Sequence, residues 1–132
     1  MPVKFVKLYT RELVQQNPEW RFVFGDNFEK KGLGGQARAC RWEPNAIGWP
    51  TKKAPNNLPA SYLTEEDYGL WLPFFTDAYA ETFFALKDGR VVVFPEDGIG
   101  TGLARLPEKA PKIYNTINES IANLVERFGL VK

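Results

Sequence analysis

The most regular hydrophobic pattern of the chain lies near its end. Apolar residues recur there at intervals of three and four positions, as Ile113, Ile117, Ile121, Leu124, Val125 and Phe128. This spacing places them on one face of an α-helix. Gly129 follows directly and is suited to end the helix. The pattern predicts a final amphipathic helix over roughly residues 113–128.

Four shorter stretches have the hydrophobic pattern of β-strands. Residues 3–9 alternate apolar and basic side chains, which is typical of a strand with one solvated face. Residues 20–24, 46–49 and 90–94 are compact apolar runs, and each ends where glycine, proline or polar residues begin. These boundaries favour short strands that are followed by turns.

Helices are predicted between the strands. Thr10 is placed to cap a short helix through Gln16, and a helix over roughly 36–41 follows the first glycine cluster. A long helix is expected from Thr64 to about Leu86.

Pro73 lies inside this long helix and predicts a kink or a break. Strands that alternate with helices predict an α/β fold. We expect a three-layer α/β/α sandwich with a small, mostly parallel sheet, formed by residues 1–132 as a single domain.

Composition excludes several kinds of chemistry. The 132 residues include no histidine and a single cysteine, Cys40. Histidine-based catalytic triads and metal sites are therefore excluded, and so is an intramolecular disulfide. We expect no metal and no resident cofactor. The formal net charge of +1, with both signs interspersed, gives no electrostatic argument for nucleic acid or an anionic membrane. Without an apolar signal segment at the N-terminus, the expected location is cytoplasmic.

Two glycine-rich segments carry the strongest functional signal. Gly32, Gly34 and Gly35 follow the strand at 20–24, and Gly98, Gly100 and Gly102 follow the strand at 90–94. A glycine loop between a strand and a helix presents backbone N–H groups to an anion, usually a phosphate. Each loop could instead be only a tight connection. The number of glycines favours close approach of a ligand to the backbone, since a simple turn needs one.

Polar residues stand beside these loops. Asn27 ends the predicted strand before the first loop, where its amide either makes a local turn or holds a ribose hydroxyl. Lys52 and Lys53 follow another strand end and form either a solvated basic loop or a phosphate site. Asp97 either caps its loop or receives a ribose hydroxyl. All these positions follow the carboxyl ends of predicted strands, where open α/β sheets bind ligands.

The order of these motifs resembles the macrodomain superfamily, which binds ADP-ribose. The resemblance covers roughly residues 20–128 and rests on Asn27, on Gly34-Gly35 with Ala37, on Pro50-Thr51-Lys52-Lys53 and on Gly98-Ile99-Gly100-Thr101-Gly102-Leu103. It is nearest to the terminal ADP-ribose protein glycohydrolases and to related small bacterial and phage proteins of unknown function.

The resemblance implies a role for each matched residue. Asn27 would lie near the distal ribose, Gly34 and Gly35 along the diphosphate, and the loop with Gly98, Gly100, Thr101 and Gly102 at the second phosphate. Lys52 would match the lysine nucleophile of the glycohydrolases. That branch carries an acid after Gly-x-Gly-Leu, where this chain has Ala104. Asp97, on the other side of the loop, is the candidate to replace it. A lysine nucleophile without an acid is slow, so we favour binding over catalysis.

Aromatic residues suggest a second function. Trp42, Trp49, Tyr62, Trp71 and Phe74 exceed what a core of this size needs, and exposed aromatic patches anchor protein interfaces. A protein-interaction module or self-association through this patch is therefore an alternative to ligand binding. Burial within a two-sided helix, an engineered surface, or stacking of Trp42 and Trp49 on a base would also explain these residues. Nucleic-acid binding is the weakest alternative because overall charge is balanced. It would use a basic edge with Trp49 for stacking, formed by Lys30, Lys31, Arg38, Arg41, Lys52 and Lys53.

Overall fold

A four-stranded, all-parallel sheet forms the centre of the molecule in the computed structural model, which describes residues 2–131. The strand order is β1-β4-β2-β3. The strands are β1 (Val3–Val6), β2 (Arg21–Asn27), β3 (Ala46–Lys52) and β4 (Val92–Pro95). The α/β class predicted from the alternation of strands and helices is confirmed.

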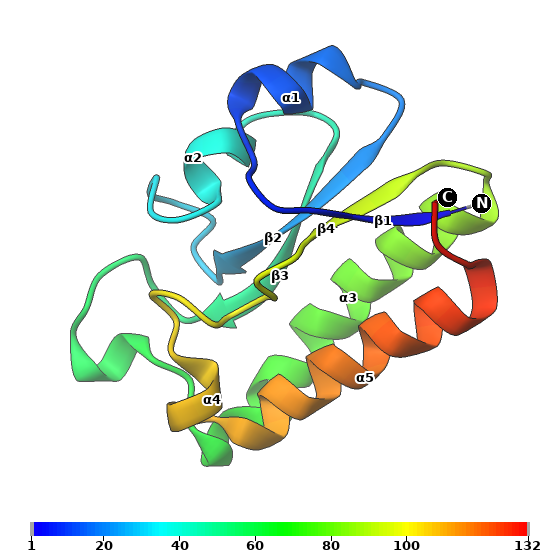
Figure 1. The fold of residues 1–132 in the computed structure, drawn as a ribbon. Helices are drawn as coiled ribbons and strands as arrows, with labels where there is room; N and C mark the ends of the chain where they lie inside the picture. The colour runs from blue at the N-terminus through cyan, green and yellow to red at the C-terminus, as the bar shows by residue number, and fades with distance from the viewer. Residues whose placement is uncertain (1, 132) are drawn as a thin grey trace.

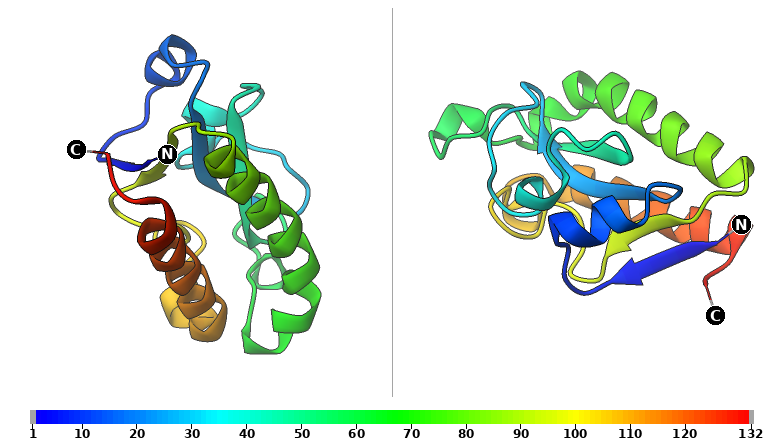
Figure 2. Two further views of the ribbon diagram at one scale, coloured as in Figure 1. Left: turned by 90° about the vertical axis from the view of Figure 1, so that its right-hand side faces the viewer. Right: turned by 90° about the horizontal axis from the view of Figure 1, so that it is seen from above.

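Helices cover both faces of the sheet. They are α1 (Arg11–Gln16), α2 (Ala37–Cys40), α3 (Tyr68–Lys87), α4 (Leu106–Lys109) and α5 (Pro111–Phe128). The long helices α3 and α5 lie on one face, and the short helices α1 and α2 lie on the other (Figures 1 and 2). The arrangement is a small three-layer sandwich. Within residues 2–131, no helix is both long enough and apolar enough to cross a membrane.

Each face of the sheet has its own hydrophobic core. The larger core joins the sheet to α3 and α5 and contains Trp49, Trp71 and Phe94. The smaller core joins the sheet to α1 and α2 and contains Phe22 and Val93. Parallel strands that are buried on both faces have continuous runs of apolar residues in their sequence, and β2 and β4 show this pattern.

The elements begin and end close to where local sequence signals place them. Thr10 Oγ1 accepts a hydrogen bond from Leu13 N at 3.0 Å and so caps α1. Gly129 ends α5 with a φ of +84°. The strand predicted over 3–9 stops at Val6, and β3 extends beyond the predicted residue 49 to Lys52.

Of the kink or break predicted at Pro73, the break does not occur, and α3 continues through Pro73 as one helix (Figure 1). Proline removes only its own hydrogen bond to the carbonyl one turn earlier, close to the helix start. The buried side chains of Trp71 and Phe75, on either side of Pro73, hold this part of the helix against the sheet.

Candidate functional site

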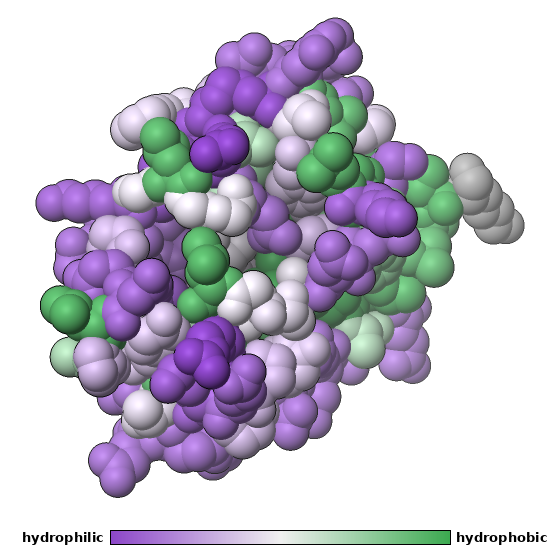
Figure 3. Space-filling view, turned by 60° about the vertical axis from the view of Figure 1, so that its left-hand side comes forward, coloured by the Kyte–Doolittle hydropathy of each residue, from purple (hydrophilic) through white to green (hydrophobic). Residues whose placement is uncertain are grey.

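A cleft lies at the carboxyl edge of the sheet, on the left of Figure 1, where β2, β3 and β4 all end. Its volume is about 360 Å³. One side is the loop over residues 31–36 after β2, and the other is the loop over residues 97–104 after β4. Figure 3 turns this side forward and shows separate hydrophobic side chains around pale, weakly polar residues. The structure thus brings the two predicted glycine loops together.

The two loops approach each other closely, and one of their glycines cannot be replaced without strain. A Cβ atom on Gly34 would lie 2.9 Å from Leu103 Cδ1 of the opposite loop. A Cβ atom on Gly25, at the end of β2, would lie 3.8 Å from Gly100 N. Gly100 itself has a φ of +83°, and a Cβ there would lie 2.4 Å from Leu106 Cδ1. Both backbone conformation and space therefore require glycine at this position.

The loops turn their carbonyl groups toward the protein. Gly32 O accepts from Arg41 Nε, Gly34 O from Ala37 N, Gly100 O from Leu106 N, and Gly102 O from Arg105 N. By contrast, the backbone N–H groups of residues 32–36 and 100–104 have no acceptor among the residues that the structure describes. Unpaired N–H groups in adjacent loops form the kind of concave surface that binds anions.

A buried ion pair supports the first loop. Arg41 forms two hydrogen bonds to the carboxylate of Asp26, at 2.6 and 2.9 Å, and both side chains are about 7% exposed. The same guanidinium donates to Lys31 O at 3.0 Å and to Gly32 O at 3.1 Å. Two-point binding fixes the guanidinium plane, so Arg41 sets the position of the loop backbone.

The cleft has a positive electrostatic balance. Lys7, Lys31 and Lys52 line it, whereas Asp97 is its one carboxylate outside the Asp26–Arg41 pair, counting residues 2–131. A concave surface with one sign of charge concentrates counter-charged ligands. The arrangement therefore favours an anionic ligand.

Lys52 lies in the cleft wall and is 7% exposed. Its Nζ donates to Asn56 O at 2.6 Å and stands 4.6 Å from the centre of the Tyr62 ring. Burial lowers the pKa of the Lys52 ammonium. A lowered pKa increases the fraction of neutral, nucleophilic amine.

The other predicted ligand residues line the same cleft, but they differ in whether their side chains already form hydrogen bonds within the protein. Asn27 Nδ2 donates to Lys31 O at 2.8 Å, so its amide stabilises the turn between β2 and the first loop. Asp97 is exposed, and its backbone carbonyl accepts from Thr101 Oγ1 at 2.9 Å. Ala104 lines the cleft where the resembling glycohydrolases carry an acid. Gly35, Gly98, Thr101 and Gly102 all lie on the two loops that border the cleft.

The predicted aromatic interface is partly wrong. Trp49 and Trp71 are fully buried, and Tyr62 is 9% exposed, so these three side chains form no surface patch. Trp49 Nε1 donates to Thr82 Oγ1 and Trp71 Nε1 donates to Pro50 O, which satisfies both indole donors inside the core. Burial between the sheet and α3 also excludes Trp49 as a stacking platform in the cleft. Trp42 and Phe74 remain exposed, at 82% and 46%.

Sequence reasoning missed the role of Asp26 and Arg41. Arg41 is predicted only as part of a basic edge, and Asp26 has no predicted role. Both residues stand among other polar and charged residues, so no local pattern marks them as a buried pair.

No group of three or more His, Cys, Asp or Glu side chains able to hold a metal ion occurs among residues 2–131. Comparison with known protein families matches residues 4–120 to DUF7831, a family of unknown function. Neither the curated proteins nor the solved structures contain a match to the chain.

Proposed function

We propose that this chain, which belongs to the DUF7831 family of unknown function, binds ADP-ribose or a related nucleotide diphosphate in the cleft between its glycine loops. The observation that carries the proposal is the meeting of two loops with unpaired N–H groups at the carboxyl edge of a parallel sheet. Open α/β sheets bind their ligands at this edge. A diphosphate offers two anionic groups to two adjacent loops.

The charges around the loops support the same ligand class. Lys31 continues the first loop, and Lys7 enters the cleft from the segment after β1. Exposed Leu33 and Leu103 border the cleft and offer apolar contact to a base or sugar. The sugar and base are inferred from the macrodomain resemblance, whereas the anion follows from the loops themselves.

Calorimetric titration tests the proposal. ADP-ribose, inorganic pyrophosphate and adenosine are titrated separately into the purified chain, together with thermal-shift measurements. We expect saturable binding of ADP-ribose, weaker binding of pyrophosphate and the weakest binding of adenosine. The absence of heat and of a thermal shift with ADP-ribose at millimolar concentration would contradict the proposal.

Hydrolysis of an ADP-ribosyl bond is a second candidate function, favoured by the lowered pKa of Lys52 inside the cleft. The neutral amine of Lys52 would attack the anomeric carbon as the bond to the leaving group breaks, and the Asp97 carboxyl group would protonate that group. Water would then hydrolyse the lysine adduct, which releases ADP-ribose and regenerates the amine. Incubation with ADP-ribosylated protein and cyanoborohydride would trap the lysine adduct. Loss of the adduct in Lys52→Met with retained ADP-ribose binding would separate catalysis from binding.

A further inference from the structure

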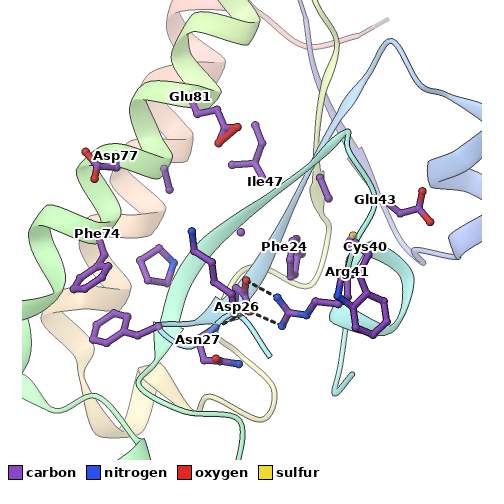
Figure 4. A pocket seen from close by; sticks show the side chains of 17 residues that line it. Phe24, Asp26, Asn27, Cys40, Arg41, Glu43, Ile47, Phe74, Asp77 and Glu81 are labelled. Atoms are coloured by element: carbon purple, nitrogen blue, oxygen red, sulfur yellow. Dashed lines mark hydrogen bonds and ion pairs between the residues drawn. The ribbon is translucent and has the colours of Figure 1, made fainter. Parts of the chain in front are cut away.

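A second hollow, adjacent to the cleft and sharing Asp26, Asn27 and Arg41 with it, runs along the outer edge of β3. We name it the β3 groove. Its volume is about 410 Å³, and it lies between α3 and the segment that joins α2 to β3 (Figure 4). The residues that define it are Trp42, Glu43, Gly48, Phe74, Asp77 and Glu81.

The backbone of β3 is open toward this groove. β3 is the last strand of the sheet and pairs with β2 alone as a strand. Phe22 N donates to Asn45 O, and Phe22 is the register partner of Ala46. Because hydrogen-bonding direction alternates along a parallel strand, the N–H and C=O groups of Gly48 point away from β2.

The open part of the edge is short and has defined ends. Pro50 has no N–H, and its carbonyl accepts from Trp71 Nε1 at 2.7 Å. Lys52 bridges to Tyr62, which covers the strand beyond that point. Ala46 N donates to Glu43 O at 3.2 Å, and the backbone groups of Ile47 face β2. The free backbone groups are therefore the carbonyl of Ala46 and the N–H and C=O of Gly48, enough for a few hydrogen bonds to one added strand. An added strand gains affinity from such backbone bonds and specificity from its alternating side chains.

The side chains around the groove indicate what partner it accepts. Among the charged side chains that line the groove, Asp26 pairs with Arg41 and Glu43 pairs with Arg11. Asp77, Glu81 and Lys30 form no ion pair within residues 2–131, so two carboxylates stand against one ammonium. Glu81 projects from α3 on the side of β3 (Figure 4). Phe74 stacks on Phe28 with ring centres 4.3 Å apart, which gives an apolar wall. Trp42 stands 82% exposed on a backbone with a φ of +68°, a conformation unusual for a bulky residue.

We infer that the β3 groove binds an extended peptide segment with basic side chains, which adds as a strand to residues 46–48 while its lysine or arginine side chains face Asp77 and Glu81. Trp42 and Phe74 contact the apolar side chains of the segment. A second copy of the chain is disfavoured as the occupant, because pairing this face with itself would bring the Asp77 and Glu81 carboxylates of both copies together.

The test uses a fluorescently labelled, acetylated peptide of alternating valine and lysine. Anisotropy is measured with the purified chain, against a valine–glutamate peptide of equal length and a valine–lysine peptide with alternate backbone nitrogens methylated. We expect binding of the unmethylated basic peptide alone. Hydrogen exchange of the Gly48 amide should slow in its complex.

Three variants test whether the charges and the exposed ring of the groove contribute to peptide binding. The double variant Asp77→Asn/Glu81→Gln should weaken binding by about tenfold, as expected for two partly exposed ion pairs. Trp42→Ala should also weaken binding, because it removes an exposed ring of the groove. Glu119→Gln, an exposed substitution on α5, is the matched control and should leave binding unchanged.

Several results would overturn the inference. Equal binding of the methylated peptide would show that no strand is added, and equal binding of the acidic peptide would show that Asp77 and Glu81 do not select the partner. A dimer in sedimentation that Trp42→Ala dissociates would identify a second copy as the occupant. The residues varied in this test, Trp42, Asp77 and Glu81, do not line the cleft, so failure of ADP-ribose binding and failure of peptide binding are distinguishable.

Discussion

At the residue scale, the Asp26–Arg41 pair links the core to the cleft. The pair is buried, and Arg41 also holds the carbonyls of Lys31 and Gly32. The position of the Asp26 carboxylate requires glycine at residue 48, since a Cβ atom on Gly48 would lie 2.7 Å from Asp26 Oδ2. One ion pair therefore constrains both the neighbouring strand and the first glycine loop.

Arg41→Met should be strongly destabilising, because it leaves the Asp26 carboxylate buried without a partner. We expect a loss of about 3–5 kcal/mol in the free energy of unfolding, measured by denaturant titration. ADP-ribose binding should fall as well, because the loop loses its support. Arg105→Met removes the exposed pair with Glu108 and serves as the control, with little expected change. Equal stability of the two variants would contradict a structural role for the buried pair.

Cys40 predicts a pH dependence of stability. Burial raises the pKa of its thiol from 9.0 to about 12. The unfolded chain therefore loses this proton first as pH rises, so stability is constant below about pH 9 and declines as pH rises from about 9 to 12. Between pH 8 and pH 10 the thiol should account for a loss of about 1 kcal/mol.

Denaturant titration of Cys40→Ala at both pH values checks this expectation. The variant should show a smaller loss between them than the original chain. Tyr9, whose pKa is also raised by burial, leaves a residual decline above pH 10 in both proteins. Identical pH profiles would exclude the thiol as the cause.

The tryptophans show where residue-level prediction fails. Composition predicted more aromatic side chains than the core needs, yet Trp49 and Trp71 are both fully buried. Their indole N–H groups are satisfied by Thr82 and Pro50, partners 33 and 21 positions away in sequence. Such long-range partners leave no local pattern, so the sequence alone could not separate these residues from the exposed Trp42.

At the scale of elements, the helices and strands were largely predictable because their signals are local. The three- and four-residue spacing predicted α5, and Thr10 predicted the start of α1. α4 was missed because its four residues are too few for a periodic pattern. The positions of both glycine loops were predicted, but their contact through Gly34 and Leu103 depends on strand order.

Gly34→Ala tests the contact between the loops. The added Cβ would lie 2.9 Å from Leu103 Cδ1, and Leu103 must move because Gly34 does not have a positive φ. We expect nearly unchanged stability but weaker ADP-ribose binding, measured by denaturation and calorimetry. Leu103→Ala in the same chain should restore part of the affinity. Gly69→Ala, where a Cβ meets nothing within 4 Å, is the control, and an equal loss of binding there would refute the loop mechanism.

Pro73→Ala tests the cost of a proline within α3. Pro73 is exposed, so alanine removes little buried surface and restores the hydrogen bond to the carbonyl one turn earlier. We expect the free energy of unfolding to rise by about 1–3 kcal/mol, less than the full helix-interior penalty because the unfolded chain also gains freedom. Thermal or chemical denaturation measures the change. A decrease would show that the proline ring makes a favourable contact.

At the scale of the whole molecule, the net charge of +1 conceals a separation of charge. Outside the buried and paired groups, lysines outnumber the single carboxylate of Asp97 in the cleft, whereas Asp77 and Glu81 outnumber Lys30 in the β3 groove. The sequence intersperses these charges, and only the fold sorts them onto two sites. Overall charge balance therefore argues against extended nucleic-acid binding without excluding a local anion site.

This separation predicts salt-sensitive binding of anions in the cleft. Raising NaCl from ~0.05 M to ~0.5 M shortens the Debye length to a few ångströms, so the affinity for ADP-ribose and pyrophosphate should fall. Lys31→Gln should weaken binding at low salt and reduce its salt dependence, because one charge beside the first loop is lost. Lys87→Gln is the control, because Lys87 is exposed at the far end of α3 and its substitution lowers the net charge of the chain by the same amount as Lys31→Gln. Equal effects of the two substitutions would mean that net charge, and not the local field of the cleft, attracts the ligand.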